Sequence, residues 1–81
     1  MYNIFGFYKF KKLTSLKLKK KSLYSLFIKN DIRGTIIISN EGLNGTISFK
    51  SNKFDNITTS LKNIFNIKKF NNENLTKYKF Q

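Results

Sequence analysis

The sequence contains no cysteine, histidine, proline or tryptophan. Without cysteine it has no thiolate nucleophile, disulfide or thiolate metal site, and without histidine it lacks the usual general base and the commonest metal ligand. The remaining carboxylates, Asp31, Glu41, Asp55 and Glu73, lie far apart in the sequence. We therefore expect no catalytic residue, metal site or cofactor site within this chain.

Long hydrophobic runs are also missing. The longest aliphatic run is Ile36-Ile37-Ile38, whereas a membrane-spanning helix needs about 20 apolar residues. The first residues do not show a charged region followed by an apolar one and a small-residue cleavage site, so no export signal is predicted. These features predict a cytoplasmic protein without a membrane segment, and the lack of cysteine agrees with a reducing compartment.

What the chain does have is positive charge. Its 81 residues, enough for a single small domain, include 16 Lys and Arg against 4 Asp and Glu, giving a net charge of +12. This balance favours polyanionic partners such as nucleic acid. Five residue types with A·T-rich codons, namely Lys, Asn, Ile, Phe and Tyr, supply 49 of the 81 residues. The charge therefore partly reflects genome composition and does not by itself establish RNA binding.

The first half of the sequence predicts a strand, a helix and a second strand. Residues 2–10 are rich in aromatic and β-branched types and have apolar side chains in both alternation phases, as in a central strand covered on both faces. A helix is predicted from Thr14 or Ser15, either of which can be its N-cap, to Asn30. Residues 35–39 form a β-branched run that predicts the next strand. The helix carries an apolar stripe of Leu16, Leu23, Leu26 and Phe27, and Lys17, Lys19, Lys20 and Lys21 can face water.

The second half predicts a hairpin, a helix and a last strand. Residues 40–45 include the pair Asn44-Gly45, a strong signal for a tight turn, and residues 46–50 alternate polar and apolar types. Asn52 can cap a helix that has Asp55 in its first turn. Residues 75–80 alternate again after a polar loop. The second helix has apolar residues at helical spacing: Ile57, Leu61, Ile64 and Phe65.

The element order is thus β-α-β-β-α-β. This order is typical of the ferredoxin-like α+β sandwich, in which two helices pack on one face of a four-stranded antiparallel sheet. We expect residues 1–81 to form one such domain and the other face of the sheet to be free. The predicted core consists of Leu23, Phe27, Ile57, Leu61 and Phe65 from the helices, packed on Ile36, Ile38, Ile47 and Phe49.

Three segments resemble a known family, the bacterial rhodanese-domain tRNA uridine hydroxylases. Residues 33–48, RGTIIISNEGLNGTIS, resemble that family's hydrophobic strand, E-G-I-N-G/A turn and returning strand. Residues 7–10, FYKF, resemble its first strand, and residues 23–27, LYSLF, resemble the end of its first helix. The three matches occur in the family's order and extend the resemblance over nearly the whole chain.

The resemblance implies an acylphosphatase-like N-terminal domain. In family members it is followed by a rhodanese domain whose cysteine carries the oxygen-dependent modification of the tRNA wobble uridine. These 81 residues include no rhodanese segment and no cysteine, so the family's catalytic residue has no counterpart here. The resemblance implies a domain that binds or positions tRNA and braces a rhodanese domain, with tRNA and that domain as partners. Whether the chain is a fragment, a truncated product or a free-standing protein stays open.

Candidate site residues follow from the same segments. Within the turn motif Glu41, Gly42, Asn44 and Gly45, the last three residues are explained by turn geometry, because Gly and Asn tolerate positive φ. The Glu41 carboxylate could hold the turn by accepting backbone N–H bonds, or could orient a substrate or a neighbouring domain. Around Tyr8 and Phe10, aromatic and basic side chains alternate, as in proteins that bind single-stranded RNA. The candidates for RNA binding or domain docking are Tyr8, Lys9, Lys11, Lys12, Arg33, Glu41 and Asn44.

Two alternative functions remain. One is a stand-alone small basic RNA-binding module, although residues 43–49 lack the glycine-aromatic signature of an RNA-recognition motif. The other is an acylphosphatase-like hydrolase, for which Asn40 could position water. That chemistry would need an Arg and a Gly in the loop after the first strand, and residues 11–14 contain neither.

Overall fold

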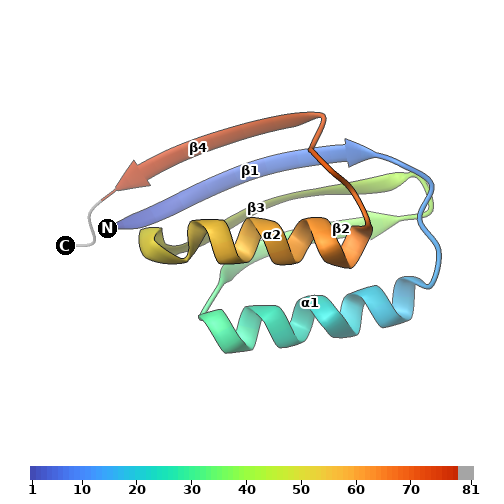
Figure 1. The fold of residues 1–81 in the computed structure, drawn as a ribbon, viewed down its shortest axis with the longest axis horizontal. Coiled ribbons are helices and arrows are strands. Elements are labelled where there is room, and N and C mark those ends of the chain that lie inside the picture. The colour runs from blue at the N-terminus through green and yellow to red at the C-terminus, as the bar shows by residue number, and fades with distance from the viewer. Residues whose placement is uncertain (79–81) are drawn as a thin grey trace.

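The computed structural model describes residues 1–78, which form a sheet covered on one side by two helices (Figure 1). The strands are β1 (Tyr2–Phe10), β2 (Arg33–Ser39), β3 (Gly42–Lys50) and β4 (Asn72–Tyr78). The helices are α1 (Leu16–Asn30) and α2 (Phe54–Phe65), the latter preceded by a 3-10 turn at Ser51–Lys53. The order β-α-β-β-α-β confirms the ferredoxin-like prediction.

The sheet has the strand order β2-β3-β1-β4, and every neighbouring pair is antiparallel. The two central strands, β1 and β3, pair along their whole length from Tyr2↔Lys50 to Phe10↔Gly42. Alternate residues of β1 face the helices, so Phe5 and Phe7 are buried while Ile4, Tyr8 and Phe10 are exposed on the other side. The sequence predicted cover on both faces of β1, but within residues 1–78 only one face is covered.

The core lies between the sheet and the helices. Phe5, Phe49, Ile57, Leu61 and Phe65 are almost completely inaccessible to solvent. Of the predicted core, Leu23 and Ile47 are also buried, whereas Phe27, Ile36 and Ile38 are only partly buried against the cluster.

The tight turn of the hairpin is not at the Asn-Gly pair. The structure places the turn at Asn40-Glu41, and both Asn44 and Gly45 lie inside β3. Only Gly42 of the predicted turn glycines has a positive φ, +150°. Gly45 serves packing instead, because a Cβ there would lie 3.0 Å from the Phe7 ring and 2.9 Å from Ile36. Tertiary pairing with β1 therefore overrides the local turn signal.

The bounds of α1 agree with the prediction, since Ser15 precedes the helix and Asn30 ends it, although the Ser15 side chain makes no capping hydrogen bond and its backbone is left-handed. Two other boundaries differ from the prediction. Asn52 lies in the 3-10 turn, so Lys53 rather than Asn52 precedes α2. β4 begins at Asn72 because pairing with Tyr8 extends it into the polar segment, and the predicted strand residues Lys79 and Phe80 lie outside the described residues.

Candidate functional site

Three connections meet at one end of the sheet, where β1 ends. The backbone N–H of Lys11 donates to the carbonyl of Glu41 at 3.0 Å, and the N–H of Leu13 donates to the carbonyl of Asn40 at 3.0 Å. These bonds tie the β1–α1 loop to the β2–β3 turn. The Nζ of Lys11 also donates to the carbonyl of Asn66, just after α2.

The α2–β4 loop is fixed at the same end. The N–H of Asn71 donates to the carbonyl of Tyr8 at 2.8 Å, and the N–H of Phe10 donates to the side-chain Oδ1 of Asn71 at 2.6 Å. Residues 55 and 61 positions apart in sequence are therefore held side by side.

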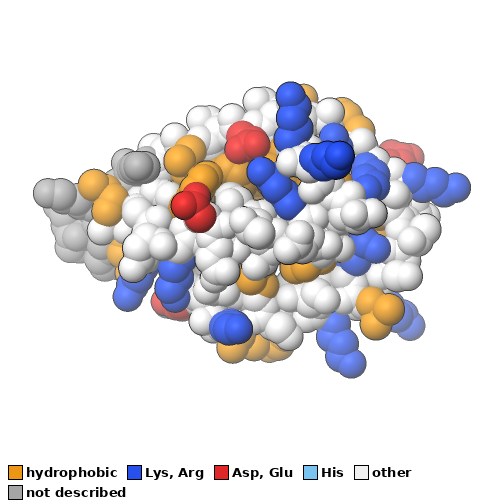
Figure 2. Space-filling model, viewed as in Figure 1, with side chains coloured by type: hydrophobic (Ala, Val, Ile, Leu, Met, Phe, Trp, Pro, Cys, Tyr) orange, Lys and Arg blue, Asp and Glu red, His pale blue; other side chains and the backbone are white. Residues whose placement is uncertain are grey.

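This assembly gathers lysines from two distant segments. Figure 2 shows blue side chains concentrated over the end where α1 begins and α2 ends, with few acidic side chains among them. We call this surface the basic end. It comprises Lys11, Lys12, Lys17, Lys19, Lys20, Lys62, Lys68 and Lys69.

Three of these lysines also have structural contacts. Lys11 holds Asn66, the Nζ of Lys19 donates to the carbonyl of Thr14 at 2.5 Å, and Lys62 lies over the Phe70 ring at 5.8 Å. The other five are exposed. Among the side chains of residues 1–76 the structure shows one ion pair, Arg33–Asp31 at 4.0 Å, at the opposite end of the sheet. The basic end therefore presents uncompensated positive charge, which suits a polyanion.

The sheet face opposite the helices differs from the basic end, because much of it carries no charged side chain. Antiparallel pairing aligns its residues in rows across the strands, because directly paired residues point to the same face. The row Ile37, Asn44, Tyr8 and Asn72 crosses all four strands. It is flanked by the rows Ser39, Gly42 and Phe10, and Thr35, Thr46, Gly6 and Asn74. We call these three rows the neutral face, since none of their residues is charged.

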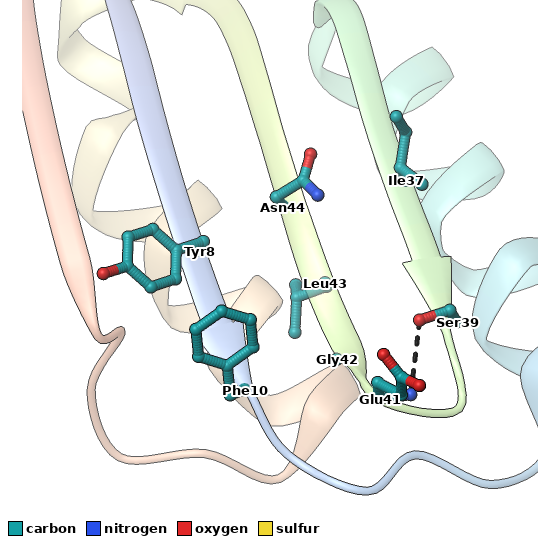
Figure 3. A pocket seen from close by; sticks show the side chains of 8 residues that line it. All are labelled: Tyr8, Phe10, Ile37, Ser39, Glu41, Gly42, Leu43 and Asn44. Atoms are coloured by element: carbon teal, nitrogen blue, oxygen red, sulfur yellow. Dashed lines mark hydrogen bonds between the residues drawn. The ribbon is translucent and has the colours of Figure 1, made fainter.

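Apolar side chains are exposed on the neutral face. Phe10 is 76% exposed, Ile37 58% and Tyr8 36%. The rings of Tyr8 and Phe10 contact one another, with centroids 5.3 Å apart. Figure 3 looks onto this face and shows the two rings and Ile37 on either side of Asn44. Between them lies an open hollow of about 440 Å³.

The structure separates the predicted site residues into groups. Tyr8 and Asn44 are directly paired on the neutral face, and Glu41 lies at its rim, where its N–H contacts the Ser39 hydroxyl at 3.2 Å. Lys11 and Lys12 belong to the basic end.

Two predicted site residues do not join these groups. Lys9 is half-buried on the helix side of β1. Arg33 begins β2, six residues from Ser39, which at about 3.3 Å per residue places it roughly 20 Å from the hollow. Arg33 and Asn40 therefore lie at opposite ends of β2 and do not assemble a phosphate cradle.

Sequence reasoning missed Ile37 and Ser39 of the neutral face and Lys68 and Lys69 of the basic end. The signal for Ile37 was its alternation with Ile36 and Ile38, which face the helices. Lys68 and Lys69 could not be joined to Lys12 from sequence, because long-range contacts such as those of Lys11 with Asn66 and of Tyr8 with Asn71 bring the two loops together.

Comparison of the sequence with known protein families and proteins identifies the family of this domain. Residues 2–80 match the model of the UPF0176 acylphosphatase like domain. The chain belongs to this family. None of the solved structures matches the sequence of this acylphosphatase like domain.

Two relatives of this UPF0176 domain carry a functional name. A protein of Pelagibacter ubique named tRNA uridine(34) hydroxylase is 58% identical over all 81 residues, which cover 27% of that protein. A protein of the same name from Prochlorococcus marinus is 35% identical over 69 residues, which are 85% of this chain and 22% of that protein. The chain thus spans about a quarter of the length of these relatives.

Two further observations concern the described part of this UPF0176 domain. Neither α1 nor α2 is long and apolar enough to cross a membrane. Residues 1–78 also contain no group of three acidic side chains placed to hold a metal ion.

Proposed function

We propose that this chain is the N-terminal, tRNA-positioning domain of a tRNA uridine hydroxylase-like protein. In this proposal the basic end binds the tRNA backbone, and a catalytic domain of the rhodanese kind, outside these 81 residues, modifies the wobble uridine in the cytoplasm. The observation that carries the proposal is the gathering of lysines from two distant segments of the sequence at one end of the domain. The relatives named as tRNA hydroxylases supply the identity of the polyanion.

The composition of the basic end suits phosphate contacts rather than base recognition. Lysine presents a compact point charge on a flexible stem, and each phosphate it neutralises releases condensed counterions. Lys12, Lys68 and Lys69 are exposed on loops whose backbones are hydrogen-bonded to neighbouring elements. The backbones that carry these three lysines are therefore held in place, and the structure shows no ion pair between their side chains and an acidic residue among residues 1–76.

The test is a titration of the chain with unmodified tRNA over a series of salt concentrations. If the basic end contacts the RNA backbone, the logarithm of the affinity falls linearly with the logarithm of salt, by about 0.7–0.9 per phosphate contact. The triple variant Lys12→Gln, Lys68→Gln, Lys69→Gln should reduce this slope by about 2–3 and weaken binding at least tenfold in low salt.

A matched control removes the same charge from the other end of the molecule. Lys29→Gln, Arg33→Gln and Lys50→Gln change exposed side chains and leave the same net charge as the first triple variant. We expect this control to change the affinity far less. Equal loss in the two triple variants would show that only net charge matters, and no binding of the unchanged chain in low salt would refute the proposal.

A further inference from the structure

We propose that the neutral face is the surface on which the catalytic domain of a hydroxylase-type protein docks. This inference rests on the proposed function, because it takes the chain to act beside such a domain. It assigns the two surfaces different partners: the lysines of the basic end contact RNA, and the charge-free rows around Tyr8 and Asn44 contact protein.

The first argument is the distribution of lysine. Lys and Arg make up 16 of the 81 residues, yet none occurs from Gly34 to Phe49, where Glu41 is the one charged residue. Thr35, Asn44 and Thr46 in this segment are exposed. If composition drift alone acted, lysine would also be expected at exposed positions in this segment. Its absence from them indicates that this surface is kept free of charge for a reason other than solvation. Charged residues are depleted in the same way at the centres of protein interfaces.

The second argument is the apolar content of β1 on this face. Tyr8 and Phe10 belong to the neutral face, and Ile4 lies on the same side of the sheet in the adjoining row that also holds Arg33. They alternate with the buried Phe5 and Phe7, so both sides of the strand carry large apolar groups. Strands with this pattern are typically covered on both faces. In residues 1–78 the helices cover one face, which leaves the other for a partner outside the described residues.

Charge identifies the occupant. Nucleic acid is a poor match, because phosphates would meet no cation within the three neutral rows and the basic end offers many. A second copy of the chain is also disfavoured, since each copy carries +12 and the two would repel. A protein surface without strong charge meets neither obstacle.

The size of the face favours a domain joined in the same protein. Four strands about 4.8 Å apart and roughly 23 Å long give a face of roughly 450 Å². Counted on both partners, roughly 900 Å² would be buried. That is below the roughly 1,600 Å² of a stable free complex but within the roughly 600–1,500 Å² of interfaces between domains of one chain. In the Pelagibacter relative the matching segment is 27% of the protein, so ample chain exists there to supply the partner.

The experiment uses the absence of natural cysteine from these 81 residues. Thr46→Cys places a thiol on the neutral face, and Ser25→Cys places a control thiol on the exposed side of α1. Each variant is compared as the free 81-residue chain and as a chimera in which these 81 residues replace the matching segment of the Pelagibacter relative. Alkylation by iodoacetamide is followed at each site by mass spectrometry of peptides, with and without tRNA.

Docking predicts that the thiol of the Thr46→Cys variant reacts at least tenfold more slowly in the chimera than in the free chain, without tRNA. The thiol of the Ser25→Cys variant should react at similar rates in both. Equal rates at position 46 would overturn the inference. The inference would also be overturned if the thiol at position 46 reacted slowly in the free chain in a concentration-dependent way, which would indicate a second copy. It would likewise be overturned if the reaction slowed only in the presence of tRNA. If the chimera does not fold, thiols at the aligned positions of the intact relative and of its isolated matching segment make the same comparison.

The labelling result is independent of the proposed tRNA contact. A chain that failed to bind tRNA would refute the role of the basic end while leaving protection of the thiol at position 46 to be observed. Conversely, an unprotected thiol at position 46 together with steep salt dependence of tRNA binding would overturn the docking inference alone.

Discussion

At the scale of single residues, Gly42 is a position where the backbone leaves no space for a side chain. It begins β3 directly after the turn with φ +150°, and a Cβ there would collide with the carbonyl oxygen of Lys9. The clash is with backbone of the central strand, which cannot move aside without breaking its pairing. The glycine in the hairpin motif therefore has a steric explanation that involves no ligand.

We expect Gly42→Ala to lower the free energy of unfolding by at least about 1–3 kcal/mol, because the side chain adds both strain and a clash. Gly6→Ala is the matched control: Gly6 lies in β1, and the nearest atoms to a Cβ added there would be 3.9 Å away. It should be neutral or slightly stabilising, since alanine restricts the unfolded chain more than glycine does. Urea denaturation of both variants checks this, and similar stabilities would contradict it.

At the scale of elements, the two helices contribute unequally to the core. α2 presents Ile57, Leu61 and Phe65 on one stripe, all buried. α1 buries Leu23 and Leu26 but leaves Leu18, Tyr24 and Ile28 largely exposed. α2 therefore contributes more to the core than α1, and the carbonyl of Asn66, just after α2, accepts a hydrogen bond from the Nζ of Lys11.

Leu61→Ala should cost about 2–5 kcal/mol of stability, because it opens a cavity in a close-packed site. Leu61 is 0% exposed, whereas Leu18 of α1 is 66% exposed and provides a control with the same chemistry. Leu18→Ala should change stability by less than about 0.5 kcal/mol. Thermal and denaturant unfolding measure both, and an unchanged stability of the Leu61 variant would mean that α2 does not pack as the structure shows.

At the scale of the whole molecule, charge is divided between surfaces, and the sequence has neither cysteine nor histidine. The basic end and the neutral face share the edge at Phe10, which pairs with Gly42 next to the β2–β3 turn. A protein docked on the neutral face would thus lie beside RNA held at the basic end. This arrangement fits a positioning domain, because orientation of a substrate requires no reactive group of its own.

We expect the isolated chain to produce no hydroxylated uridine and to hydrolyse no acyl phosphate. It has neither a sulfur nucleophile nor a histidine. Incubation with unmodified tRNA followed by mass spectrometry of the nucleosides tests the first part, and release of phosphate from an acyl phosphate tests the second. Uridine that gains one oxygen in a protein-dependent manner would contradict this prediction.

The sequence by itself determined the order and type of the elements. The aromatic and β-branched types of residues 2–10 and the helical spacing of Ile57, Leu61 and Phe65 are local features, because they are contained within a few residues of the chain. The same patterns located most of the core, and the segments around residues 7–10 and 33–48 indicated the family. The boundaries at Asn52 and Asn72 were wrong because capping and strand ends also depend on contacts with distant residues.

Only the tertiary structure decided which residues share a surface. The Asn44-Gly45 pair is a turn signal locally, but pairing of β3 with β1 keeps it in a strand and places Asn44 beside Tyr8. Lys12 and Lys68 lie at the same end of the sheet because of contacts between loops that are far apart in sequence. Arg33 lies at the opposite end of the sheet. The physical reason is that sheet register and loop packing are set by long-range burial and hydrogen bonding, which no local period encodes.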